Sequence, residues 1–301
     1  MTTRENTLTV NGVSFAVIES GAQDGPLALC LHGYPDTAWT WRHLMPELAH
    51  AGWRAVAPFT RGYAPTSLPA DGRYQSGALV ADANALHGAL GGSGDAVLIG
   101  HDWGAVAAYG AASHQPQRWQ RVVTLAIPPA PVMARAFTDV EQLKRSWYMF
   151  FQCTALAEHV IARDKLAFLR TLWNDWSPGY DATEDVELVA EALAEPSHLL
   201  AALGYYRAQF GIDELDPLLA DEQQATAMTP PQPTLYMHGG SDGCLAAEYA
   251  SSVLGFLAHE SEVDVIKDAG HWLHLEKSQE VNRRIVEFVG ARKPRPGGAS
   301  R

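Results

Sequence analysis

Short apolar runs along the chain alternate with longer stretches in which apolar residues recur at helical spacing. The runs that predict strands lie at 7–10, 13–18, 27–31, 54–57, 96–99, 121–127, 234–238 and 263–266. Most are short and apolar throughout, which is typical of strands buried on both faces of a parallel sheet. The first two flank Asn11-Gly12, a strong signal for a two-residue hairpin. Helical stretches such as 40–51, 75–90 and 103–113 separate the later runs, so the pattern predicts an α/β fold with a mostly parallel sheet and helices on both faces.

The alternation stops after position 127 and resumes at 234, behind a Thr-Pro-Pro-Gln-Pro linker. Helical patterns fill the interval, which is too long for an ordinary loop. We therefore expect a helical cap over 133–221, inserted after the sixth strand of an eight-stranded sheet, and a core domain made of 1–132 and 222–290. The segment 291–301 is rich in proline and glycine, and we expect it to be a disordered tail.

Composition and charge narrow the class of partner. The chain has 22 Lys and Arg against 34 Asp and Glu, a net charge of −12. It lacks the basic footprint that a phosphate backbone requires, so we expect neither nucleic acid nor an anionic membrane as a partner. No apolar run approaches the roughly 18 residues of a membrane span.

Cysteine is scarce, with Cys30, Cys153 and Cys244 far apart and odd in number. A disulfide framework is therefore not expected, and a reduced cytoplasm suits the chain. The first residues contain no apolar segment typical of a secretory signal. Association into a homo-oligomer is left open.

The segment Gly100-His101-Asp102-Trp103-Gly104 ends a predicted strand and begins a predicted helix. This is the position and spacing of a nucleophile elbow, G-x-S-x-G, with Asp102 in place of the serine. Glycines permit the tight turn, and the helix N-terminus favours a carboxylate. An aspartate that only caps the helix is the alternative.

Two further residues complete a candidate triad in the chain order nucleophile, acid, base. His271 follows the last strand in Gly270-His271, and Asp242 follows the strand before it. Glu248 and Asp268 are the spare acids. A zinc site at His271, His274 and Glu276 lacks the H-E-x-x-H pattern, so we expect no metal and no cofactor.

A carboxylate nucleophile points to chemistry at saturated carbon. A serine alkoxide suits acyl transfer, whereas a carboxylate can displace a leaving group to form an alkyl-enzyme ester. Water would then attack the ester carbonyl, with His271 as general base and Asp242 fixing its tautomer.

The sequence resembles the α/β-hydrolase superfamily and, within it, the epoxide hydrolases. The residues that carry the resemblance, over about 12–289, are His32-Gly33-Tyr34-Pro35, Thr40-Trp41-Arg42, Arg61-Gly62-Tyr63, the elbow with Asp102, Gly204-Tyr205-Tyr206-Arg207 and Gly270-His271. The resemblance implies an oxyanion hole from the backbone N–H groups of Tyr34 and Trp103. It also implies that the Tyr34-Pro35 bond can be cis.

The resemblance further implies paired tyrosines in the cap that protonate the epoxide oxygen. Tyr206 matches the second of them. Two alignments compete for the first, one selecting Tyr148 and the other Trp147, and we prefer Tyr148 because an indole N–H is not a comparable acid. Core packing is the alternative for either tyrosine. Trp103 and Trp147 are candidate walls of the substrate pocket.

These observations predict an epoxide hydrolase that converts a small, neutral, apolar epoxide and water to a diol through an ester on Asp102. Haloalkane dehalogenase is the nearest alternative. Members of that group often carry Asn in the loop where this chain has Tyr34, and fluoroacetate-type enzymes have Arg where Trp103 stands. A catalytically silent hydrolase fold used for binding is the other alternative, although Asp102, Asp242 and His271 are all present.

Overall fold

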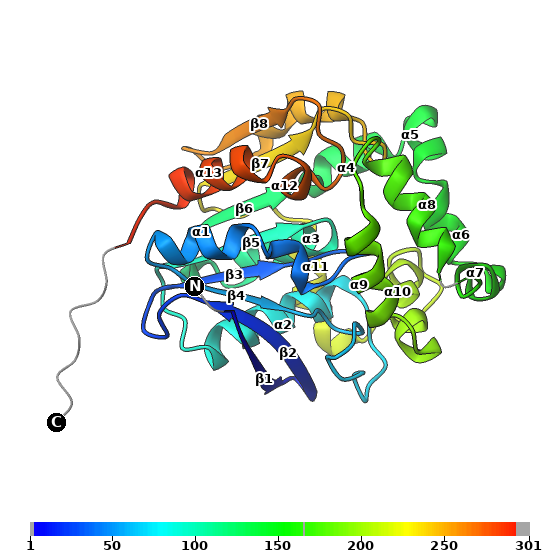
Figure 1. Ribbon diagram of the computed structural model, residues 1–301, viewed down its shortest axis with the longest axis horizontal. Coiled ribbons are helices and arrows are strands. Elements are labelled where there is room, and N and C mark those ends of the chain that lie inside the picture. The colour runs from blue at the N-terminus through cyan, green and yellow to red at the C-terminus, as the bar shows by residue number, and fades with distance from the viewer. Residues whose placement is uncertain (1–2, 165, 293–301) are drawn as a thin grey trace.

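The structure is a computed structural model that describes residues 3–164 and 166–292. Within those residues, eight strands form one sheet in the order β1-β2-β4-β3-β5-β6-β7-β8 (Figure 1). The strands are β1 Arg4–Val10, β2 Val13–Ser20, β3 Leu27–Leu31, β4 Arg54–Pro58, β5 Ala96–His101, β6 Trp119–Leu125, β7 Thr234–Gly239 and β8 Glu262–Ile266. Each of them corresponds to one run predicted from the sequence.

The sheet begins with an antiparallel hairpin and continues as a parallel sheet. β1 pairs with β2 and β2 with β4 in antiparallel fashion, and the remaining neighbours are parallel. Asn11 and Gly12 both have positive φ, 49° and 73°. Those signs are what a type I′ turn requires, which explains the Asn-Gly pair at this position.

Helices cover both faces of the sheet (Figure 1). They are α1 Leu44–His50, α12 Leu273–Glu276 and α13 Ser278–Val289, which pack together, and α2 Ser76–Ala89 and α3 Trp103–His114, which pack on each other. Alternate residues of one strand enter different cores: Leu29 and Leu31 join the cluster around α2 and α3, and Ala28 and Cys30 join the cluster around α1 and α13. This alternation explains why the strands are apolar on both sides.

The helix expected over 40–51 is divided in two. A 3₁₀ turn, η1 Ala38–Trp41, precedes α1. Pro46 lies in the first turn of α1, where its missing N–H costs no hydrogen bond, and it would break a helix that began much earlier.

The long interval between β6 and β7 folds into helices. They are α4 Ala130–Ala136, α5 Val140–Arg145, α6 Trp147–Gln152, α7 Ala155–Ile161, α8 Ala167–Trp176, α9 Thr183–Ala192, α10 Pro196–Gln209, η3 Pro217–Leu219 and α11 Ala220–Ala225. The first and last of these pack on the sheet domain, α4 on η4 Ala247–Phe256 and α11 on α2 and α3. We propose that 133–221 forms the cap and that 1–132 with 222–290 forms the core domain.

Most of the expected tail lies outside the described residues, but Arg292 is described, and its N–H donates to the carbonyl oxygen of Ala51 at 2.7 Å. Among the described helices, none combines the length and apolar character needed to cross a bilayer.

Candidate active site

Asp102 stands at the turn between β5 and α3, with φ 54° and ψ −121°. This left-handed conformation is costly for a residue with a side chain, and such strain clusters at functional sites. A Cβ on Gly100 would lie 2.1 Å from the carbonyl oxygen of Gly104, and one on Gly104 would lie 2.1 Å from that of Leu31. Only glycine fits at either position, so the backbone packing explains the elbow pattern.

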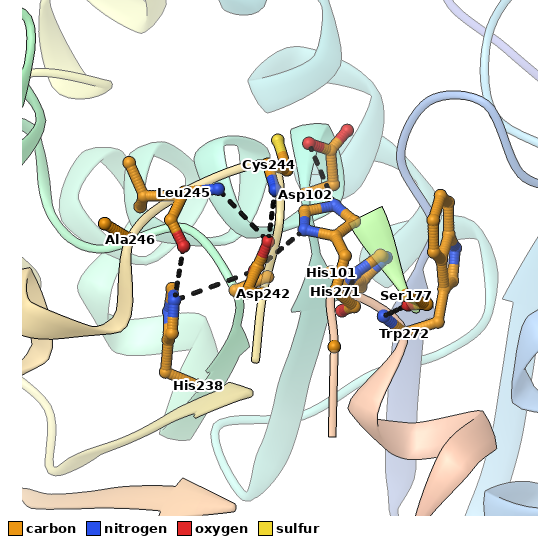
Figure 2. Close-up of polar contacts among 12 residues, drawn as sticks. His101, Asp102, Ser177, His238, Asp242, Cys244, Leu245, Ala246, His271 and Trp272 are labelled. Atoms are coloured by element: carbon orange, nitrogen blue, oxygen red, sulfur yellow. Dashed lines mark hydrogen bonds and ion pairs between the residues drawn. The ribbon is translucent and has the colours of Figure 1, made fainter. Parts of the chain in front are cut away.

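The three candidate triad residues meet at the carboxyl edge of the sheet (Figure 2). His271 Nδ1 lies 3.0 Å from Asp242 Oδ2, and His271 Nε2 lies 3.7 Å from Asp102 Oδ2. The first distance is a hydrogen bond and the second an ion-pair separation. All three side chains are buried.

The loop after β7 holds Asp242. Its Oδ1 accepts from the backbone N–H groups of Cys244 at 2.7 Å and Leu245 at 3.1 Å. Its Oδ2 faces His271 Nδ1 and also lies 3.6 Å from His238 Nε2 (Figure 2). The N–H of His271 donates to the carbonyl oxygen of Trp176 at 3.0 Å. The base loop is therefore bonded to α8, a helix of the insertion.

The pair of carboxylates determines the charge state of His271. Burial alone would lower the pKa of His271, but Asp242 and Asp102 outweigh it and raise that pKa to about 10. Burial would raise the pKa of Asp102 and of Asp242, yet the imidazolium between them lowers both. The resting site is thus an imidazolium flanked by two carboxylates at neutral pH.

The loop after β3 contacts one oxygen of Asp102. The backbone N–H of Tyr34 donates to Asp102 Oδ1 at 2.8 Å. A Cβ on Gly33 would lie 2.3 Å from that same Oδ1 and 2.7 Å from the backbone nitrogen of Trp103. The close approach requires glycine and brings together the two N–H groups expected for an oxyanion hole. The Tyr34–Pro35 peptide bond is cis.

The two candidate cap tyrosines lie beside each other, with ring centroids 5.9 Å apart. The hydroxyl of Tyr206, on α10, is buried and has no hydrogen-bond partner among the described residues. The hydroxyl of Tyr148, on α6, lies 3.3 Å from Cys244 Sγ. Burial raises the pKa of both hydroxyls well above the usual value, so both stay protonated.

Trp147 does not fit the prediction of a pocket wall. It is 47% exposed, and its ring packs against Phe151 and Phe168 on the outer side of the insertion. Adjacent helical residues point about 100° apart. Because Tyr148 faces Tyr206, the neighbouring indole turns away from the site.

A cavity of about 290 Å³ opens beside Asp102. Trp103 and Tyr206 line it together with apolar side chains, among them Val106, Met133 and Phe210. The volume is at the small end of ligand sites, and the apolar walls suit an uncharged ligand.

Three contacts around the site were not predicted from the sequence. His101 Nε2 lies 3.0 Å from the carbonyl oxygen of His271, and Gln152 Nε2 donates to the hydroxyl of Tyr34 at 2.8 Å. Cys244 contacts Tyr148, as described above. Gln152 follows Tyr148 by four residues, a spacing that places both on one helix face and could have identified it.

Two groups of buried side chains have the donor types of a metal site. The first group is Asp36, His101 and His274, and the second is Asp242, Cys244 and His271. Within each group, the atoms that could bind a metal lie within 4.8 Å of one another. Protein hydrogen bonds already use several of these atoms: Asp36 Oδ2 accepts from Trp272 Nε1 at 2.9 Å, and Thr40 Oγ1 lies 2.6 Å from His274 Nε2. Glu276, the third residue of the zinc alternative, accepts instead from Ser177 Oγ at 2.6 Å.

Known proteins share the fold of this chain, and several of them are named epoxide hydrolases. Residues 26–278 match the family model described as the alpha/beta hydrolase fold. An epoxide hydrolase of Caballeronia sordidicola is 32% identical, with 95% of this chain and 93% of that protein covered. Epoxide hydrolase A of Mycobacterium tuberculosis is 28% identical, with 95% and 97% covered.

Among solved structures, the Bacillus megaterium epoxide hydrolase, crystallised with an inhibitor, superposes with a TM-score of 0.80. It is 28% identical, and the superposition covers 94% of this chain and 99% of that one. The chain therefore belongs to the α/β-hydrolase fold family, among the epoxide hydrolases of that superfamily.

Proposed function

We propose that the chain hydrolyses an epoxide to a vicinal diol through an alkyl ester on Asp102. One observation carries the proposal: the two oxygens of that carboxylate have different partners. Tyr34 N–H holds Oδ1 at 2.8 Å, and Oδ2 lies 3.7 Å from His271 with no hydrogen bond to it. Oδ2 is thus the oxygen available to attack carbon, and the names of the relatives support an epoxide as the substrate.

Ring opening is the first step. A lone pair of Oδ2 forms the bond to a ring carbon, and the carbon–oxygen bond of the epoxide breaks towards the ring oxygen. That oxygen takes a proton from the hydroxyl of Tyr206, with Tyr148 as second donor. The lowered pKa of Asp102 keeps the nucleophile ionised, because His271 carries a positive charge beside it.

Esterification then changes His271. It removes the negative charge of Asp102, one of the two charges that raise the pKa of His271. The imidazolium can therefore return a proton to the tyrosinate and become the neutral base that the second step requires.

Ester hydrolysis is the second step. His271 takes a proton from water while Asp242 orients the ring, and the resulting hydroxide attacks Cγ of Asp102. Oδ1 becomes the oxyanion and is stabilised by the N–H groups of Tyr34 and Trp103. Breaking the Cγ–Oδ2 bond releases the diol, whose second hydroxyl takes the proton of the new carboxyl group.

The test is a variant that stops between the two steps. With His271→Gln, ester hydrolysis stops, and mixing with styrene oxide at alkaline pH keeps Asp102 ionised without the imidazolium. Intact-mass spectrometry should then show one added substrate mass. Asp102→Ala is the matched control and should show none. An unmodified His271→Gln chain that still forms diol would refute the ester.

A parallel screen separates the alternatives. Wild-type protein is incubated with epoxides and with bromoalkanes, and diol and halide release are both measured. Halide release without diol would identify a dehalogenase, and binding without turnover would identify a silent fold.

A further inference from the structure

We infer that the substrate is a terminal epoxide with a single neutral, unbranched or flat substituent, and that this substituent lies in a slot along α3. The inference rests on the proposed function and specifies its substrate class. Three features support it: the cavity runs along α3, aromatic rings pack around the rest of the site, and the residues that line the cavity are mostly uncharged.

The cavity extends along one face of a single helix. Asp102, at the N-cap of α3, lines it together with Val106 and Tyr109. The last two are three residues apart and lie on one side of that helix. Thr226 lines the far end, where it lies beside Gly110: a Cβ on that glycine would be 3.0 Å from the Thr226 methyl group. The seven residues from Asp102 to Tyr109 correspond to about 10 Å.

Trp176 and Tyr34 do not line the cavity and pack against the other side chains of the site. Trp176 contacts both Tyr148 and His271, with centroid distances of 4.6 Å and 5.2 Å. Tyr34 packs edge-on against Tyr206 at 5.2 Å. All these rings are buried. An epoxide held between Asp102 and Tyr206 can therefore direct one substituent into the slot, while its other carbon must carry only hydrogen atoms on the packed side.

The slot offers nothing to a charged tail. Among the described residues that line it, Asp102 is the one with a formal charge, and none is Lys, Arg or His. Gln209 and Ala227 line the cavity and are exposed to solvent, so we place its mouth at these two neutral residues. A carboxylate at the end of the substituent would find no partner and would be repelled by Asp102 and by the net charge of −12.

The length of the slot sets a limit on the substituent. An extended chain advances roughly 1.2 Å per bond, since a residue of three backbone bonds spans about 3.5 Å. About eight bonds therefore fill the 10 Å slot. Each methylene added within it should raise kcat/KM by about fourfold, and the rise should stop once the chain reaches the mouth.

Matched substrates test the shape. The first pair is 1,2-epoxyoctane, with one hexyl group on the ring, and its isomer trans-4,5-epoxyoctane, with one propyl group on each ring carbon. We expect kcat/KM to favour the terminal isomer by at least a hundredfold. The second pair is 1,2-epoxyheptane and 6,7-epoxyheptanoate, whose carboxylate would lie inside the slot, and we expect the neutral compound to be favoured at least tenfold.

A matched pair of variants tests the slot. Val106 lies midway along it, one turn from Asp102, so Val106→Phe should lower kcat/KM for 1,2-epoxydecane at least tenfold more than it lowers kcat/KM for 1,2-epoxybutane. Val140→Phe makes the same change on α5, where the side chain is 63% exposed, and should alter neither.

The outcomes are distinguishable. If no epoxide yields diol, the proposed function fails. If diol forms but the two octane isomers react equally, or if Val106→Phe leaves the chain-length profile unchanged, the proposed function stands and the slot is refuted.

Discussion

The charge state of His271 predicts a specific dependence of stability on pH. The pKa of His271 rises from 6.5 to about 10 on folding, against the opposing effect of burial, because two carboxylates flank the ring. A shift of that size corresponds to about 5 kcal/mol at roughly 1.4 kcal/mol per unit. Since the folded pKa is the higher one, this stabilisation is complete below pH 6.5 and is lost as the pH rises through about 10.

The assay compares the free energy of unfolding of wild type and His271→Gln in urea between pH 6 and pH 10.5. Buried tyrosine and cysteine also titrate in this range, but they affect both proteins equally and cancel in the difference. Asp102 and Asp242 lose their charged partner in the variant, so about 5 kcal/mol is an upper limit. We expect that difference to shrink by up to about 5 kcal/mol over the range. His259→Gln, at an exposed histidine, is the control and should give a curve parallel to wild type. If the curve of His271→Gln is also parallel to wild type, the ring is neutral in the folded protein and the charge argument is wrong.

Two further substitutions test the geometry around the carboxylate. Gly33→Ala would place a methyl group 2.3 Å from Asp102 Oδ1, so the loop after β3 must move away from the carboxylate. Because a displacement of about 1 Å can cost a hundredfold in rate, we expect ring opening to slow by that order in stopped-flow measurements. A wild-type rate would contradict the close packing at Gly33. Tyr206→Phe should slow ring opening by about 10²- to 10⁴-fold, because it removes the proton donor. The Tm should not change, because the lost hydroxyl has no hydrogen-bond partner among the described residues. Full activity of the variant would assign Tyr206 to packing alone.

Much of this architecture was predictable because its signals are local. The hairpin depends on two adjacent residues, Asn11 and Gly12, whose backbone angles suit only a few residue types. The elbow depends on Gly100 and Gly104, where a side chain would collide with backbone oxygen. Such requirements appear in the sequence directly, and they place Asp102 without knowledge of the rest of the chain.

The cap was less predictable because helical spacing identifies a helix but not which side of it faces the site. Trp147 and Tyr148 are adjacent aromatic residues, and either could have been buried. Packing of α6 against α10 decides that Tyr148 points inward. The contact between Tyr148 and Cys244 joins residues 96 positions apart, so no local sequence pattern predicts it. The slot proposed along α3 likewise depends on side chains of α4 and α10, which line the cavity together with those of α3.

Because the Asp102 carboxylate is held in one orientation, solvent oxygen would replace one of its two oxygen atoms and not the other. Tyr34 N–H holds Oδ1 in place, so in the proposed cycle that atom would remain through every turnover. The other position would be renewed each time, because its oxygen departs within the product and a solvent oxygen replaces it. From the second cycle onward, each diol would therefore carry an atom that entered the protein as water one cycle earlier.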